Sequence, residues 1–177
     1  MKINELKQHL NGLSKEDLVK DILDLYRKSN FVQSYLNAKY DTEKVGSILE
    51  QYKKIIEHEF FPAKGDGRAR LSVAKKAITE FRKISKDAQS NAELMVFYVE
   101  IGVKYTDYYG DIDEAFYTSM ESMYQRAVKF IIGESLGGEF EERCRKIVEN
   151  TVNMGWGFHD GLADTYYEYF VPDDASV

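Results

Sequence analysis

With 177 residues and a formal net charge of −6, the chain is long enough for one domain with a buried core, and it is too acidic for broad nucleic-acid binding. Hydrophobic residues make up 44% and charged residues 31% of the sequence, a composition that excludes both intrinsic disorder and a membrane-embedded chain. No stretch approaches the roughly 18 uninterrupted apolar residues of a membrane span, and the first residues lack the apolar run of a signal peptide. Because the single Cys144 allows no internal disulfide, we expect a cytoplasmic protein with no membrane partner.

Apolar residues recur with a helical period along the chain, and no segment shows sustained strand alternation. The first predicted helix starts at the cap residue Ser14 and carries Leu18, Ile22 and Leu25 on one face. Further helices are predicted, in chain order, around residues 31–38, 42–61, 73–84, 89–110, 116–131, 140–151 and 160–170.

These segments predict an all-α fold of seven to nine helices in antiparallel pairs, either an α-α superhelix of the helical-repeat kind or a compact bundle. We expect residues 1–170 to form a single domain and residues 171–177 a frayed tail. Residues 92–127 resemble one tetratricopeptide unit, with Gly102 and Tyr105 in the first helix and the turn GDIDEA before the second. A stable array needs at least three such units, and only one is visible.

Charge is unevenly distributed along the chain. Residues 1–62 hold ten basic and ten acidic side chains, residues 63–83 hold seven and two, and residues 84–177 hold seven and eighteen. A short basic segment therefore precedes an acidic carboxy-terminal half. We expect the two to attract each other within the fold, and the alternative is that the basic segment binds a small anion.

The basic segment begins with the loop AKGDGRARLS, residues 63–72. Two glycines allow backbone N–H groups to converge near the start of the next helix, where Lys64, Arg68 and Arg70 add positive charge. These three residues are the candidate anion-binding residues. The spacing differs from that of a Walker loop, so nucleotide hydrolysis is not indicated. In the alternative interpretation, the two arginines pair with carboxylates elsewhere in the fold.

The stretch YGDIDEAFYTSMES, residues 109–122, contains the candidate metal ligands Asp111 and Asp113. Carboxylates in a loop that leads into a helix are suitable ligands for Mg²⁺ or Ca²⁺. The same residues also suit a helix start, with Asp111 as the cap and Asp113 in the first turn. No cofactor is predicted.

The stretch GWGFHDGLADTYYEYF, residues 155–170, holds the only Trp of the chain. Its apolar side chains recur on one helical face and are expected to seal the core, and Asp160 is the predicted helix cap. His159 beside Asp160 forms the candidate catalytic pair, because an imidazole next to a carboxylate is a common acid–base arrangement.

Together, FFPAKGDGRARLS, YGDIDEAFYTSMESMY and GWGFHDGLADTYYEYF resemble an uncharacterised family of bacterial all-helical proteins, classified as a domain of unknown function. The likeness covers nearly the whole chain. It implies a cytoplasmic bacterial protein and carries over no catalytic residue.

Since no complete catalytic set is visible, we predict a module that binds a protein or peptide partner, or a small ligand. The alternative is an enzyme or small-anion binder in which Arg68 and Arg70 hold the anion and His159 and Asp160 transfer protons, with or without a metal. That alternative requires residues about 90 positions apart to meet. Whether the protein is an enzyme stays open at this point.

Overall fold

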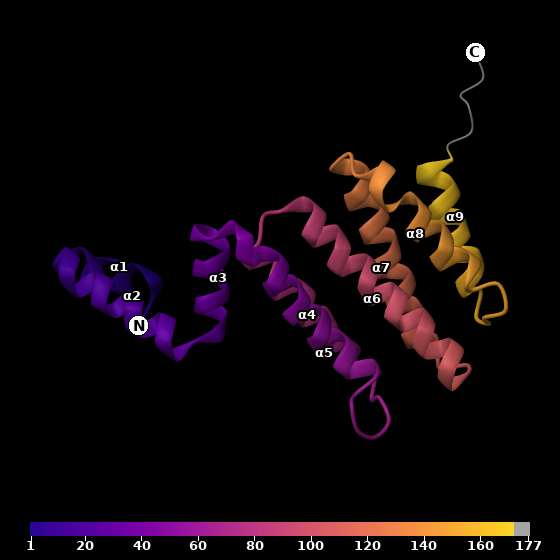
Figure 1. Ribbon diagram of the computed structural model, residues 1–177, viewed down its shortest axis with the longest axis horizontal. Coiled ribbons are helices and arrows are strands. Elements are labelled where there is room, and N and C mark those ends of the chain that lie inside the picture. Colours follow the sequence, from indigo (N-terminus) through magenta and orange to yellow (C-terminus); the bar gives the residue numbers. More distant parts are fainter. Residues whose placement is uncertain (172–177) are drawn as a thin grey trace, which may run out of the picture.

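The computed structural model describes residues 1–171, which form nine α-helices, one 3₁₀ helix and no strand (Figure 1). The helices are α1 (Ile3–Asn11), α2 (Lys15–Lys28), α3 (Asn30–Tyr40), η1 (Thr42–Lys44), α4 (Val45–Phe60), α5 (Leu71–Ile84), α6 (Ala88–Tyr109), α7 (Glu114–Gly133), α8 (Gly137–Glu149) and α9 (Phe158–Phe170). The predicted all-α class is confirmed. The tail predicted for residues 171–177 lies, apart from Val171, outside the described residues. Within the described part of the chain, no helix has both the length and the apolar character needed to cross a bilayer.

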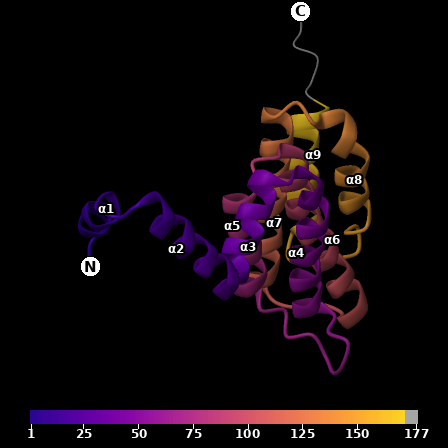
Figure 2. The ribbon, with the colours of Figure 1, turned by 60° about the vertical axis from the view of Figure 1, so that its left-hand side comes forward.

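Helices α4 to α9 form a bundle in which α6 is central. It packs against α4, α5, α7 and α8, and α9 closes the bundle against α7 and α8 (Figures 1 and 2). Every buried side chain of the described residues lies between Ile48 and Tyr166. The helix predicted around residues 116–131 is α7, and the apolar stripe that recurs along it at helical spacing is buried: Phe116, Met120, Met123, Ala127 and Ile131. The buried hydrophobic core is therefore built by α4 to α9.

In the turn between α6 and α7, the residue that caps α7 differs from the predicted one. Gly110 ends α6 with a φ of 84°, a left-handed conformation that glycine adopts without strain. The helix cap that follows is Asp113, whose carboxylate accepts a hydrogen bond of 2.8 Å from the Phe116 N–H, and not Asp111 as predicted. Two aspartates two positions apart are equally good caps by composition, and the path of the turn decides between them.

The start of α9 also differs from the prediction. Gly157, with a φ of 68°, precedes Phe158, so the helix begins before Asp160 and that residue lies in the first turn instead of capping it. The aromatic residues of this stretch do not all seal the core. Phe158 and Tyr166 are buried, whereas Trp156 and Tyr167 are 60% and 59% exposed.

The first two helices lie outside the bundle. We call residues 1–28, which include α1 and α2, the amino-terminal arm. Figures 1 and 2 show the arm extending away from the bundle, and α2 connects to it by packing on α3, which in turn contacts α4 and α5. None of α1, α2 and α3 has a buried residue. The predicted face of Leu18, Ile22 and Leu25 thus belongs to a helix that does not join the core.

Candidate functional site

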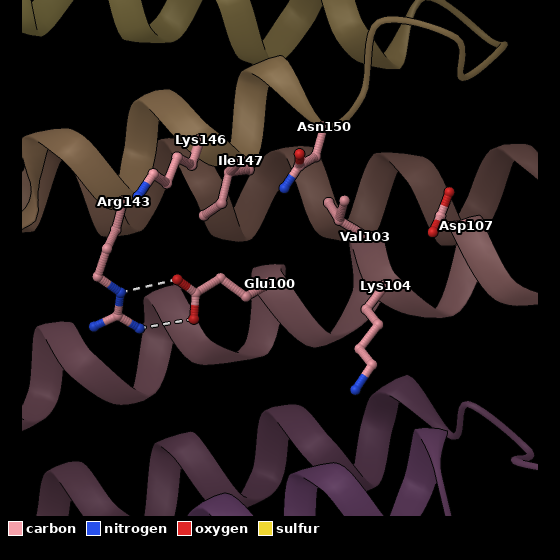
Figure 3. A pocket seen from close by; sticks show the side chains of 8 residues that line it. All are labelled: Glu100, Val103, Lys104, Asp107, Arg143, Lys146, Ile147 and Asn150. Atoms are coloured by element: carbon pink, nitrogen blue, oxygen red, sulfur yellow. Dashed lines mark hydrogen bonds and ion pairs between the residues drawn. The ribbon is translucent and has the colours of Figure 1, made fainter.

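A cleft of about 460 Å³ lies between α6 and α8 (Figure 3). Both signs of charge line it. Its walls are formed by Glu100, Val103, Lys104 and Asp107 of α6 and by Arg143, Lys146, Ile147 and Asn150 from α8 and its end.

Arg143 is the centre of an ion-pair network on one side of this cleft. Its Nε and Nη2 atoms donate to the two carboxylate oxygens of Glu100 at 2.8 and 2.7 Å, the parallel pair drawn in Figure 3, and its Nη1 donates to Glu93. Lys53 of α4 forms a further ion pair of 2.7 Å with Glu93. Side chains from α4, α6 and α8 are therefore joined through two carboxylates, and the hydrogen bond to Glu100, the strongest influence, raises the pKa of Arg143.

Glu93 has a lowered pKa for a related reason. Burial alone would raise the pKa of this carboxyl group, but the hydrogen bonds from Arg143 and Lys53 and their charges outweigh that effect and bring it below 4.5. The folded protein therefore holds Glu93 ionised at a pH where the same group in the unfolded chain takes up a proton.

Both lysines of the cleft also have partners inside the protein. The Lys104 ammonium lies 5.2 Å from the ring centre of Phe61, and Lys146 forms an exposed ion pair of 3.3 Å with Glu142. Cys144, next to Arg143 in sequence, is fully buried, and burial raises the pKa of its thiol to about 12. Of the charges in this cleft, the Glu100–Arg143 pair thus joins α6 to α8, whereas the ion pair of Lys146 lies within α8. The raised pKa keeps the Cys144 thiol protonated at neutral pH, so this thiol is not a nucleophile.

The loop between α4 and α5 brings the three predicted anion-binding residues together. Lys64, Arg68 and Arg70 line one pocket of about 380 Å³, which His58 and Asp66 also line. Arg70, however, already makes a bidentate ion pair with Glu59, at 2.7 Å from Nε and 2.8 Å from Nη2. Glu59 is only 5% exposed, so this pair neutralises a buried carboxylate.

This pairing corrects the expected attraction between the basic segment and the acidic carboxy-terminal half. Within the described residues, the ion pairs of segment 63–83 join Arg70 to Glu59 and Lys76 to Glu80, both of which precede residue 84. The nearest carboxylate to Arg70 is the one that α4 supplies just before the loop. The loop itself is fixed by hydrogen bonds from the Tyr105 hydroxyl to Gly67 O and from the Ala69 N–H to Glu59 O, of 3.0 and 2.8 Å.

Close approach fixes the same loop at Gly67. A Cβ atom at this position would lie 1.7 Å from the carbonyl oxygen of Phe60, a distance that no side chain tolerates. The glycine thus serves the contact between the loop and the end of α4.

His159 lies at the start of α9 and faces the end of α8. Its Nδ1 atom is 3.1 Å from the Thr151 hydroxyl and 3.2 Å from Val148 O, and the ring is half-buried. Asp160 is exposed in the first turn of α9, where a carboxylate favours the helix dipole. The hydrogen bonds of His159 run to residues 148–151, and the arginine pocket is lined by residues 58–70, so neither a hydrogen bond nor a shared pocket joins the two halves of the predicted composite site.

Asp111 connects two turns that are distant in sequence. Its carboxylate accepts hydrogen bonds from the Tyr117 hydroxyl at 2.6 Å and from the Trp156 indole N–H at 2.9 Å. Burial, and then the bond to Asp111, raise the pKa of Tyr117. Asp113 is occupied as the cap of α7. Among the described residues, no three His, Cys, Asp or Glu side chains are grouped to hold a metal ion, so Asp111 and Asp113 have no third ligand of these types.

The structure thus defines an all-helical bundle with a projecting amphipathic arm. The chain belongs to the family described as "Family of unknown function (DUF6155)", which matches residues 1–170. This confirms the predicted resemblance to an uncharacterised all-helical family. No curated protein and no solved structure matches the chain.

Sequence reasoning missed the Arg143 network and the position of the arm. The acidic partners of Arg143 lie 50 and 43 residues away, and nothing in a sequence marks which carboxylates a given arginine will meet. The sequence of the arm has the pattern of an amphipathic helix. A helix that packs on the core and a helix that packs on another molecule have the same pattern, so the position of the arm could not be predicted.

The lowered pKa of Glu93 predicts an acid-dependent contribution to stability. This contribution is present above pH 4.5 and is lost as the pH falls through the lower pKa of the folded state. We expect Glu93→Gln to lower the melting temperature by about 2–4 °C at neutral pH, and the difference from wild type to be smaller at about pH 3. Thermal unfolding followed by circular dichroism measures it, with Glu168→Gln at an exposed position of α9 as control. An equal difference at both pH values would contradict this assignment.

The ion pair of Arg70 with a buried carboxylate predicts that the two arginines of the loop differ in their effect on stability. Arg70→Ala leaves Glu59 buried without its partner, and we expect the melting temperature to fall by several degrees. Arg68→Ala, which removes an equal charge from the same loop, is the matched control and should change the melting temperature by about 1 °C or less. Equal effects of the two substitutions would show that the ion pair does not hold the loop.

The contact between Asp111 and Trp156 predicts a change in fluorescence, because Trp156 is the only Trp. We expect Asp111→Ala to shift the emission maximum towards that of a fully solvated indole. Asp113→Ala removes the cap of α7 and should lower the melting temperature by about 2–4 °C, for a loss of about 1 kcal/mol, without changing the emission. Identical spectra for the two variants would contradict the assigned roles.

Proposed function

We propose that the protein is an interaction module that binds a protein partner, and that the amino-terminal arm is its docking surface. The observation that supports this most strongly is the exposed apolar face of α2. Val19, Ile22, Leu23 and Leu25 are 48%, 50%, 47% and 55% exposed, although they follow the pattern of a helix that covers apolar surface.

The length of the helices strengthens this argument. Helices α1 and α2 contain 9 and 14 residues, and isolated helices shorter than about 12–15 residues are marginal in water. Most helices of this size gain their stability by packing an apolar face against something else. Within the described chain, the face of α2 has no such cover beyond α3, and a partner protein supplies it.

A small-anion binder at the loop of α4 and α5 is the second candidate function. Lys64 and Arg68 share a pocket, and the N-terminus of α5 has no side-chain cap, which favours an anion there. Its support is weaker because Arg70 is engaged by Glu59 and because Asp66 adds a negative charge to the same pocket.

The docking proposal is tested by comparing two single substitutions in a binding experiment. Wild type, Ile22→Glu and Ile55→Glu are used as baits in lysate of the source cells, and bound chains, including the protein itself, are quantified by mass spectrometry. Ile55 is 44% exposed on α4, so its substitution adds the same charge at an equally exposed apolar position outside the arm. We expect the amount of the specific partner bound to Ile22→Glu to be at least tenfold lower than the amount bound to wild type or to Ile55→Glu. Identical sets of bound chains for all three baits would overturn the proposed function.

A further inference from the structure

We infer that the partner of the arm is a second copy of this chain, paired through α2 in antiparallel orientation about a two-fold axis near Ile22. This inference rests on the proposed docking role of the arm and adds the identity of the partner. A two-fold pairing requires that one surface complement itself, so the distribution of apolar and charged residues along α2 is the relevant observation.

The apolar residues of α2 are arranged with the required symmetry. Successive residues of an α-helix are about 100° apart around the axis, so one continuous sector holds the apolar side chains, with Ile22 near its middle. Its members are Leu18, Val19, Ile22, Leu23, Leu25 and Tyr26. With Ile22 on the two-fold axis, Val19 faces Leu25 of the second copy, and Leu18 lies level with Tyr26, whose hydroxyl donates to Asn37 of its own α3 at 3.1 Å. The half-exposed Val19, Ile22 and Leu25 of each helix are thereby covered by their counterparts.

The charges at the two ends of α2 are also self-complementary. The first turn carries Glu16 and Asp17, and the last turn carries Arg27 and Lys28. Antiparallel pairing places the acidic end of one helix beside the basic end of the other, at both ends of the interface. Glu16 and Arg27 lie along the same edge of the apolar sector of α2. When two helices pair in antiparallel orientation about a two-fold axis, this edge of one helix lies beside the same edge of the other, so Glu16 of each copy is next to Arg27 of the second copy.

The arm as a whole carries nearly equal numbers of opposite charges. Residues 1–28 hold six basic and five acidic side chains, whereas the whole chain has a net charge of −6. A nearly neutral arm allows two copies to approach without electrostatic repulsion. An anionic membrane or a nucleic acid would instead favour a clear excess of positive charge on the docking surface. The existing ion pair of Lys28 with Asp24 rearranges in this pairing, and both of its side chains are more than half exposed.

The exposed surface of the chain is large enough for such an interface. The protein exposes 11,443 Å², whereas a compact monomer of this mass exposes about 8,900 Å². The excess is about 2,500 Å². A stable interface of standard size needs about 800 Å² from each partner.

The position of the arm is compatible with this pairing. Figures 1 and 2 show α1 and α2 extending clear of the bundle, so two bundles can lie at opposite ends of a pair of arms. The apolar surface continues onto α3, where Phe31 and Tyr35 are 41% and 39% exposed.

The first test measures the mass of the purified protein by size-exclusion chromatography with light scattering. We expect wild type and Ile55→Glu to have the mass of two chains, and Ile22→Glu to have that of one with unchanged thermal unfolding of the bundle. A wild type that is monomeric at about 100 µM overturns the inference, as does an Ile22→Glu variant that stays dimeric. If the monomeric wild type still binds another protein, or vesicles of anionic lipid, in a manner that Ile22→Glu abolishes, the arm docks elsewhere and the second-copy inference is wrong. In the protein case the proposed function stands.

The second test uses charge reversal and does not depend on apolar residues. Glu16→Lys and Arg27→Glu each place like charges opposite one another at both ends of the pair, and we expect each to weaken dimerisation by about tenfold. An equimolar mixture of the two variants should restore it. In the mixed dimer the introduced lysine faces the introduced glutamate, and the native Arg27 of one chain faces the native Glu16 of the other. If mixing restores nothing, the antiparallel pairing is wrong.

Discussion

Burial of α6 is the constraint on which the rest of the structure depends. Twelve of its 22 residues are buried, and four other helices pack around it. At Gly102 the neighbouring α7 comes so close that a Cβ atom would lie 2.3 Å from the Met120 sulfur. A helix enclosed to this degree has little exposed surface for charged side chains. Glu93 and Glu100 therefore lie on the side of α6 that faces α8, where both accept hydrogen bonds from Arg143. The charged cleft is thus a consequence of the packing.

The same constraint leaves the arm outside. Because α4, α5, α7 and α8 surround α6, and α9 packs on α7 and α8, the apolar face of α2 stays outside the core of the described part of the chain. Its pattern is nonetheless that of a helix with a buried side. Exposed apolar surface is unfavourable in water, so an apolar helix face that stays exposed in the structure is the kind of surface that another molecule covers.

The difference between what the sequence predicted and what it missed follows from the range of the interactions. Periodicity and capping act within a few residues, so the α7 stripe and the Ser14 cap of α2 could be predicted, and Ser14 does accept a hydrogen bond of 3.0 Å from the Asp17 N–H. The contact between Asp111 and Trp156 spans 45 residues, and only the assembled bundle brings the two turns together. For the same reason the separation of His159 from the arginine pocket could not be predicted.

The fold separates the residues that stabilise the bundle from those that we assign to docking. Every buried side chain of the described residues lies at or after Ile48, and the ion pairs of Arg70 and Arg143 hold helices of that same part together. We therefore expect a change in α2 to alter association while the core stays intact, and a change in the cleft or the basic loop to alter stability first. The same division is visible in the distribution of charge. In the bundle, Arg70 and Arg143 form ion pairs with carboxylates of neighbouring helices. In the arm, acidic and basic side chains lie exposed at opposite ends of the apolar face of α2. The acidic start and the basic end of α2 are complemented by a partner helix that presents a basic end to the first and an acidic end to the second. An antiparallel copy of α2 has this order of charges.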